Sequence, residues 1–165
     1  MRLTTTKLLI GFILCFVLDS QTQQTITTED LNTVKGKWTG ILTYMDYRSG
    51  KPFSMPANVE IEQGKNENQL LMHINYPKES NANSKERISI SKNGTEINRH
   101  EIISRKKLSD GQIEIITTYF GKDNNSKAQI KNIYILSENL FVIRKEVKFE
   151  GSEDWLVRNE YKYVR

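Results

Sequence analysis

The chain has very few of the residues that build covalent or metal cross-links. Its 165 residues include one cysteine, Cys15, and two histidines, His73 and His100. A single cysteine cannot form a disulfide within the chain, and metal sites need several His, Cys or carboxylate ligands at matched spacing. Neither histidine has a second histidine or a cysteine near it in the sequence. We therefore expect no disulfide framework, no metal site and no other cofactor.

Excess charge and catalytic motifs are also scarce. The formal net charge is +4, and the basic residues are spread along the chain, so we expect no nucleic-acid partner. Neither a glycine-rich phosphate loop nor a nucleophile elbow is present. The sequence therefore assigns no catalytic residue and favours a protein that is not an enzyme. The cluster Arg99, His100 and Glu101 interrupts a strand pattern and is the one candidate for an uncharacterised catalytic site.

No hydrophobic run is long enough to cross a membrane. The longest, Leu8 to Leu18, has eleven residues, whereas a spanning helix needs about 20. Arg2 and Lys7 precede this run, which is typical of an export signal. We predict a signal peptide over residues 1–20, a secreted or periplasmic location, and no membrane span after signal removal.

The remaining chain is expected to form one domain. Residues 21–27 are polar and predict a flexible leader, and residues 28–165 are enough for a single buried core. Threonines and acids precede Leu31 and Val34, which lie three residues apart. This spacing predicts one short helical turn.

From Gly36 onward, apolar residues recur at every second position. Trp38, Gly40, Leu42 and Tyr44 share one face of the first strand, and eight further runs alternate in the same way. Short turns such as Asn93-Gly94 join these runs, without helical crossovers, so neighbouring strands must pair antiparallel. We predict an all-β, up-and-down meander that closes into a barrel of eight to ten strands. An antiparallel β-sandwich is the alternative.

Three segments depart from this regular pattern. Residues 95–107 read as one return strand, with a bulge or break at 99–101. Residues 46–55 and 77–85 are polar or proline-containing and are expected to be loops. If the protein binds another protein, these two loops are the candidate contact surfaces.

The order of elements resembles that of the lipocalin-like proteins of the calycin superfamily. The likeness rests on the helical turn, on Gly36-Lys37-Trp38 opening the first strand, and on an aromatic last strand that carries an arginine. Leu42 to Lys51 is also similar to the matching stretch of small exported bacterial proteins with this fold. The resemblance implies that Trp38 plugs one end of the barrel beneath a late arginine. Arg158 is the first choice for this arginine and Arg165 the second.

The strand alternation places many aromatic residues on the predicted inner face. A barrel of this size either fills its interior or encloses one small ligand. The candidate ligand-binding residues are Tyr44, Tyr119, Tyr134 and Tyr161, and Trp155 is expected to face inward with them. Two interpretations remain open at this point. The protein is a binding barrel for a small apolar or amphipathic ligand, or it is a structural or protein-interaction barrel with a packed core.

Overall fold

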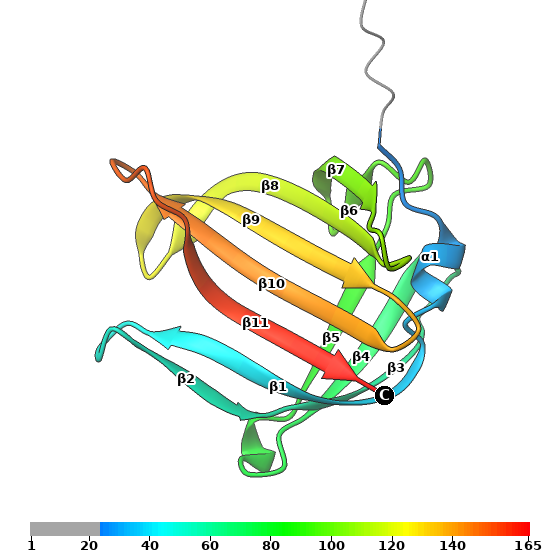
Figure 1. Ribbon diagram of the computed structural model, residues 1–165, viewed down its shortest axis with the longest axis horizontal. Coiled ribbons are helices and arrows are strands. Elements are labelled where there is room, and N and C mark those ends of the chain that lie inside the picture. The colour runs from blue at the N-terminus through cyan, green and yellow to red at the C-terminus, as the bar shows by residue number, and fades with distance from the viewer. Residues whose placement is uncertain (1–23) are drawn as a thin grey trace, which may run out of the picture.

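Eleven strands form one antiparallel sheet that curls into a nearly closed barrel in the computed structural model (Figure 1). The structure describes residues 24–165, so the predicted signal peptide lies outside the described residues. The strands are β1 (Gly36–Asp46), β2 (Lys51–Pro56), β3 (Asn58–Gln63), β4 (Gln69–Asn75), β5 (Ser84–Ser89), β6 (Glu96–Ile97), β7 (His100–Lys107), β8 (Ile113–Asp123), β9 (Ser126–Leu136), β10 (Leu140–Phe149) and β11 (Leu156–Val164).

The predicted helical turn is α1 (Thr28–Asn32), and it lies at one end of the barrel (Figure 1). Thr27 and Asp30 form a reciprocal capping box that satisfies free backbone N–H groups at the start of the helix. Arg105 of β7 donates to the Asp30 carboxylate at 3.0 Å. Ahead of α1, Ile26 is buried, and its backbone N–H donates to the carbonyl of Gly94. These contacts fix the helix against the barrel.

The strand order confirms the predicted meander and excludes a sandwich of two sheets. From one edge to the other it runs β5-β4-β3-β1-β11-β10-β9-β8-β7-β6, and β2 pairs with β1 beside this path. The two edge strands meet at Ile90 and Ile97, next to a hydrogen bond from Asn98 N to Ser89 O. Elsewhere the second edge of β5 has no strand partner among the described residues. The barrel therefore has a seam along β5.

The prediction of a loop over residues 46–55 was wrong for most of its length. Residues 51–56 form β2, which pairs with the second half of β1, from Asp46↔Lys51 to Ile41↔Pro56. Pro52 and Pro56 lack a backbone N–H, and proline is tolerated in an edge strand. The same prolines discourage pairing of this edge with another chain. Only the turn between Asp46 and Lys51 remains a loop.

The predicted interruption near residue 99 is a tight turn, which splits the expected strand into β6 and β7. Asn98 and Arg99 both have positive φ, 52° and 69°, and Ile97 pairs directly with His100 across them. A two-residue hairpin turn needs this left-handed backbone at both positions, which asparagine adopts more readily than arginine does. The predicted loop over 77–85 contains a short 3-10 helix (Ser80–Ala82), and β5 begins at Ser84.

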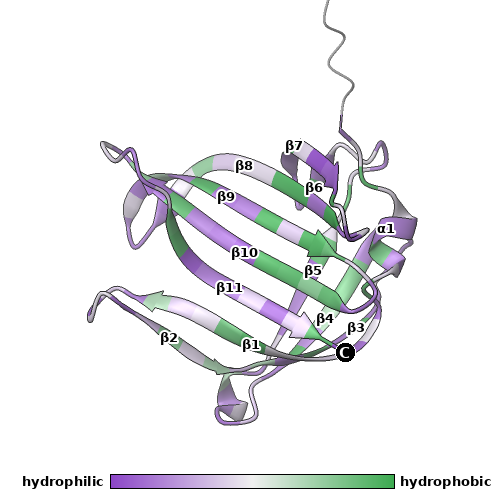
Figure 2. Ribbon diagram, in the orientation of Figure 1, coloured by the Kyte–Doolittle hydropathy of each residue, from purple (hydrophilic) through white to green (hydrophobic). Residues whose placement is uncertain are grey.

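Apolar and polar bands alternate along the strands, as Figure 2 shows for β8 to β11. The inward-facing bands form one large core that fills the end of the barrel near α1. This core contains Trp38, Phe141 and Tyr163. The ring centroid of Phe141 lies 6.2 Å from that of Trp38 and 5.8 Å from that of Tyr163. A smaller cluster of Ala128, Ile130 and Val147 lies in the opposite half.

Tyr163 lies across the backbone of β1 because residue 40 is a glycine. A Cβ added at Gly40 would come within 2.4 Å of Tyr163 Cδ1 and 2.6 Å of the Lys162 carbonyl oxygen. The carbonyl belongs to the β11 ladder and cannot move without breaking it. Gly40 therefore makes the stacked aromatic core possible.

We expect Gly40→Ala to lower the free energy of unfolding by about 2 kcal/mol or more, as overpacked core positions do. Gly121→Ala is the matched control, because its added Cβ meets the end of the flexible Ile130 side chain at 3.1 Å. It should change stability by less than about 1 kcal/mol. Chemical denaturation measures both, and equal effects would contradict this role of Gly40.

Candidate functional site

The end of the barrel near α1 is closed by Trp38 beneath an arginine. The guanidinium of Arg165 lies 3.9 Å from the centroid of the Trp38 ring. Arg165 also donates to the carbonyl oxygens of Thr33 and Lys35, at 2.7 and 3.2 Å, next to α1. Trp38 is 3% exposed, and its indole N–H donates to the Val34 carbonyl at 2.8 Å. This end of the barrel is thus packed and hydrogen-bonded.

The structure corrects the choice between the two arginines. Thr39 pairs with Val164, so the next residues outward, Trp38 and Arg165, lie opposite each other on the same face. Arg165 also follows Tyr161 and Tyr163 at every second position. Arg158 lies at the other end of β11 and cannot reach Trp38. The alternation along the last strand already favoured Arg165.

Arg158 instead joins a network at the open end of the barrel. Its Nε lies 3.3 Å from Asp123 Oδ2, and its guanidinium covers the Tyr47 ring. Lys145 Nζ lies 2.6 Å from Asp123 Oδ1, and Tyr47 donates its hydroxyl to the same carboxylate. We call Tyr47, Asp123, Lys145 and Arg158 the mouth network. It ties the end of β1 to β8, β10 and β11.

A β-bulge positions Arg158 for this role. Lys145 pairs with Asn159 and Glu146 with Val157, which leaves Arg158 as the extra residue. The bulge also reverses the alternation of β11. Trp155 therefore lies beneath Lys131 and Lys148 on the outer face, and the prediction that it faces inward was wrong.

Charge and burial shift two pKa values in the mouth network. Burial alone would raise the pKa of the Asp123 carboxyl, but hydrogen bonds from Lys145 and Tyr47 and the nearby cations lower it overall. Burial and the hydrogen bond to Asp123 raise the pKa of Tyr47 to about 12. Asp123 is therefore a carboxylate at neutral pH, neutralised within the network.

Tyrosine hydroxyls meet in the middle of the barrel. Tyr161 of β11 and Tyr76, which follows β4, share a hydrogen bond of 2.7 Å between their hydroxyls. β4 and β11 are separated by two strands in the sheet order, so this bond crosses the interior. Tyr163 stacks on Tyr161, and its hydroxyl is fully buried without a hydrogen-bond partner among the described residues. With Tyr134, which is 5% exposed, these residues form the tyrosine cluster.

A carboxylate faces the tyrosine cluster from β5. Glu86 pairs with Met72, which is 1% exposed, so both side chains lie on the inner face. Its charge contributes to raising the pKa values of Tyr134, Tyr161 and Tyr163, although burial is the main cause for each. Tyr134 reaches a pKa of about 12. The negative charge of Glu86 therefore acts on three of the four hydroxyls.

Glu86 has no hydrogen bond and no ion pair within residues 24–165. Desolvation by the surrounding protein raises its pKa, yet its side chain is exposed to solvent. Both facts fit its position next to the seam along β5. Leu42 and Ile143 also face inward and are only partly buried. Leu42 and Ile143 thus offer inward apolar surface that is not fully covered.

The four predicted ligand-binding tyrosines do not form one group. Tyr134 and Tyr161 belong to the tyrosine cluster. Tyr119 stacks on His100 with ring centroids 3.7 Å apart and contributes to raising the pKa of Tyr134, whereas Tyr44 packs against Phe53 of β2. Tyr76 and Tyr163 complete the cluster in their place. Glu86 was missed, although its spacing from Ile88 and Ile90 puts it on their face.

The three residues of the candidate catalytic cluster, Arg99, His100 and Glu101, do not converge on one point. Arg99 lies in the hairpin turn. His100 and Glu101 occupy successive positions of β7, so their side chains point to opposite faces of the sheet.

Within the described part of the chain, no group of three His, Cys, Asp or Glu residues could hold a metal ion. No helix in that part is long and apolar enough to cross a membrane.

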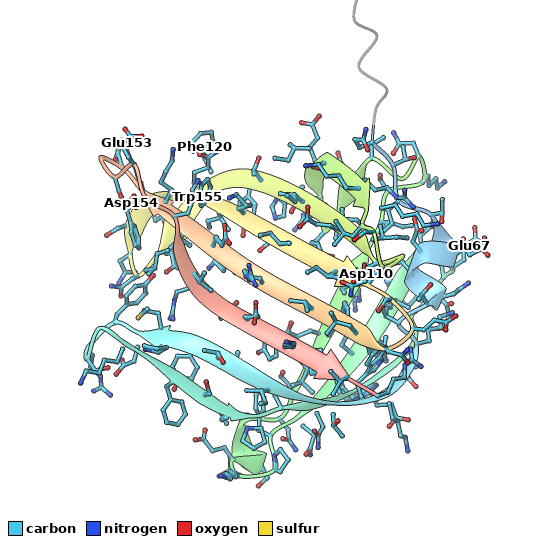
Figure 3. All side chains as sticks on the ribbon, in the orientation of Figure 1. Glu67, Asp110, Phe120, Glu153, Asp154 and Trp155 are labelled. Carbon is cyan, nitrogen blue, oxygen red and sulfur yellow. The ribbon has the colours of Figure 1, made fainter. Side chains whose placement is uncertain are left out.

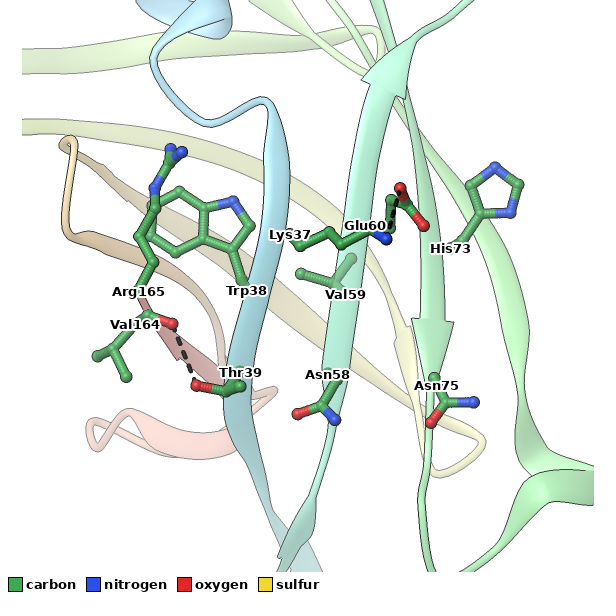
Figure 4. Close-up of a pocket in the computed structure, with 10 residues that line it drawn as sticks. All are labelled: Lys37, Trp38, Thr39, Asn58, Val59, Glu60, His73, Asn75, Val164 and Arg165. Carbon is green, nitrogen blue, oxygen red and sulfur yellow. Dashed lines mark hydrogen bonds and ion pairs between the residues drawn. The ribbon is translucent and has the colours of Figure 1, made fainter.

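A hollow of about 490 Å³ opens on the outer face of β1, β3, β4 and β11 (Figure 4). Lys37 and Glu60 form an exposed ion pair of 3.7 Å there, and Thr39 donates to the carbonyl of Val164. His73 borders this hollow and pairs with Glu62 at 2.9 Å. These solvated contacts indicate a surface depression, separate from the tyrosine cluster.

The comparisons with known proteins support the fold alone. No protein-family model and no curated protein matches the chain. A solved structure titled "Crystal Structure of Rv2717c from M. tuberculosis" is similar, with a TM-score of 0.55 and 10% sequence identity. The match covers 86% of this chain and 99% of that chain. The two chains share a fold.

We expect the plug to depend on Trp38 and Arg165. Trp38→Ala should lower the free energy of unfolding by about 3–5 kcal/mol, the usual effect of removing a large buried aromatic side chain. In a Trp155→Phe background, Arg165→Met should shift the fluorescence of Trp38 and Arg158→Met should not. A shift with Arg158→Met alone, or unchanged stability of Trp38→Ala, would contradict this assignment.

Proposed function

We propose that this protein is a lipocalin-like barrel that binds a small amphipathic ligand next to the tyrosine cluster. The observation that carries this proposal is the set of polar groups inside an otherwise apolar barrel. Among the described residues, the buried hydroxyl of Tyr163 has no hydrogen-bond partner, and Glu86, exposed beside the seam, faces the same region without an ion pair. Burying the Tyr163 hydroxyl unsatisfied costs free energy, so a barrel selected only for its core would not need it.

The chemistry of the site fits a ligand with an apolar body and one polar end. Leu42 and Ile143 offer inward apolar surface that is not fully covered, and the hydroxyls and Glu86 offer hydrogen-bonding groups. Binding sites of this kind combine apolar walls with a few polar groups that orient the ligand. The seam along β5 supplies a route to the interior.

Two further observations support the lipocalin-like part of the proposal. A short helix precedes β1, and Arg165 covers Trp38 while bonding carbonyls next to that helix. This is the arrangement that the resemblance implies. Export of the protein is also part of the proposal, supported by Arg2, Lys7 and the apolar run that follows them.

A protein-interaction barrel is the second candidate, and exposed aromatic side chains favour it. Phe120 projects from β8 and is 86% exposed (Figure 3). It borders a groove of about 350 Å³ between β8, β9 and β10. Phe53, within the segment 46–55, is 48% exposed on β2. Such side chains occur in contact surfaces between proteins.

Titration with N-phenyl-1-naphthylamine, an uncharged fluorescent amphiphile, tests the proposed function. We expect saturable binding that weakens about fivefold in Tyr161→Phe. This variant keeps the aromatic ring but removes the hydroxyl, which bonds Tyr76 and which we propose orients the ligand. Phe120→Ala is the control for the outer groove and should leave binding unchanged. Absence of binding, or loss of binding in Phe120→Ala alone, would contradict an interior site and favour the second candidate.

A further inference from the structure

We propose that the polar end of the ligand is a cation, an amine or quaternary ammonium group, and that Glu86 and the tyrosine cluster receive it. This inference rests on the proposed function and adds the chemical class of the ligand. It follows from the charges inside the barrel, from the groups that surround Glu86 and from the position of Glu86 at the seam.

The other inward carboxylates already have cationic partners. Asp30 is paired with Arg105 at the closed end. Asp123 is paired with Lys145 and Arg158 at the mouth. Glu86 has no such partner among the described residues. Glu86 therefore presents, beside the seam, one inward-directed negative charge that no described residue neutralises, and a bound cation would complete the pattern.

The groups around Glu86 fit a cation better than an anion. Met72 lies opposite it on β4, and the charge of Glu86 contributes to raising the pKa values of Tyr134 on β9 and Tyr161 on β11. Tyrosine oxygens accept hydrogen bonds, and tyrosine rings attract ammonium groups through their negative faces. An anionic ligand would meet the like charge of Glu86, which no basic side chain of residues 24–165 pairs with to offset it.

The position of Glu86 suggests how such a ligand lies. The carboxylate is solvent-exposed beside the seam, whereas Met72 is buried behind it. A cationic head held at Glu86 would place an alkyl or aromatic tail toward Leu42 and Ile143. The head then keeps contact with water, and the tail covers the partly buried apolar surface.

Three probes of equal chain length test this inference on the full chain: octyltrimethylammonium, 1-octanol and octanoate. Each probe is used to displace bound N-phenyl-1-naphthylamine. We expect the cation to bind at least about tenfold more tightly than the anion, with the alcohol between them, as expected for a partly desolvated charge pair. Equal binding of all three, or preference for octanoate, would overturn the inference while leaving the proposed function intact. Absence of binding by every amphiphile would overturn both.

Two glutamine variants assign the preference to one carboxylate. In Glu86→Gln the difference between cation and anion should fall to within about twofold, because the neutral amide removes the charge without changing the size of the side chain. Glu62→Gln is the matched control, since Glu62 pairs with His73 on the outer face. It should keep the full preference. A cation preference that survives in Glu86→Gln would contradict the role of Glu86, and the wild-type comparison alone remains decisive if that variant does not fold.

Discussion

The stacking of Arg165 on Trp38 is the contact on which the asymmetry of this barrel depends. A single curled sheet must cover its inner face, and here one end is closed by an indole, a guanidinium and the carbonyls beside α1. Tyr163 and Phe141 extend this packing toward the centre, with Gly40 leaving room for the tyrosine ring. Most of the buried apolar surface belongs to this core. The other half of the barrel can therefore hold polar groups.

Polar groups that face the interior are arranged in two different ways. In the mouth network, Asp123 is fully compensated by Lys145, Arg158 and Tyr47, so it links strands that are distant in the sheet. Glu86 is left uncompensated beside a buried hydroxyl. The buried Asp123 is paired and ties strands together, whereas Glu86 is exposed beside the seam, has no cationic partner among the described residues, and is the charge that we assign to the ligand. This difference separates the proposed site from the rest of the interior.

Much of the fold follows from period-two alternation, which predicted the meander, the barrel and the inward tyrosines. Local irregularities made the same reasoning fail at two places. Pro52 and Pro56 made the β2 segment read as a loop, and the bulge at Arg158 turned Trp155 to the outer face. Glu86 was overlooked because a charged residue beside Lys85 and Arg87 reads as surface, although its spacing from Ile88 places it inside. The pairing register of the strands decides which face such a side chain occupies, and the register cannot be read from a single sequence.

The central claim is that Glu86, exposed beside the seam, faces the tyrosine cluster as a carboxylate that has no cationic partner among the described residues. Desolvation raises its pKa in the folded state, so its contribution to stability is complete below the unfolded pKa and is lost as pH rises through the folded pKa. The most direct measurement is the free energy of unfolding of the wild type and of Glu86→Gln, from a pH below the unfolded pKa of the glutamate up to neutral pH. We predict that the variant becomes the more stable protein as pH rises to neutrality. A variant that is less stable than the wild type at neutral pH would contradict the account.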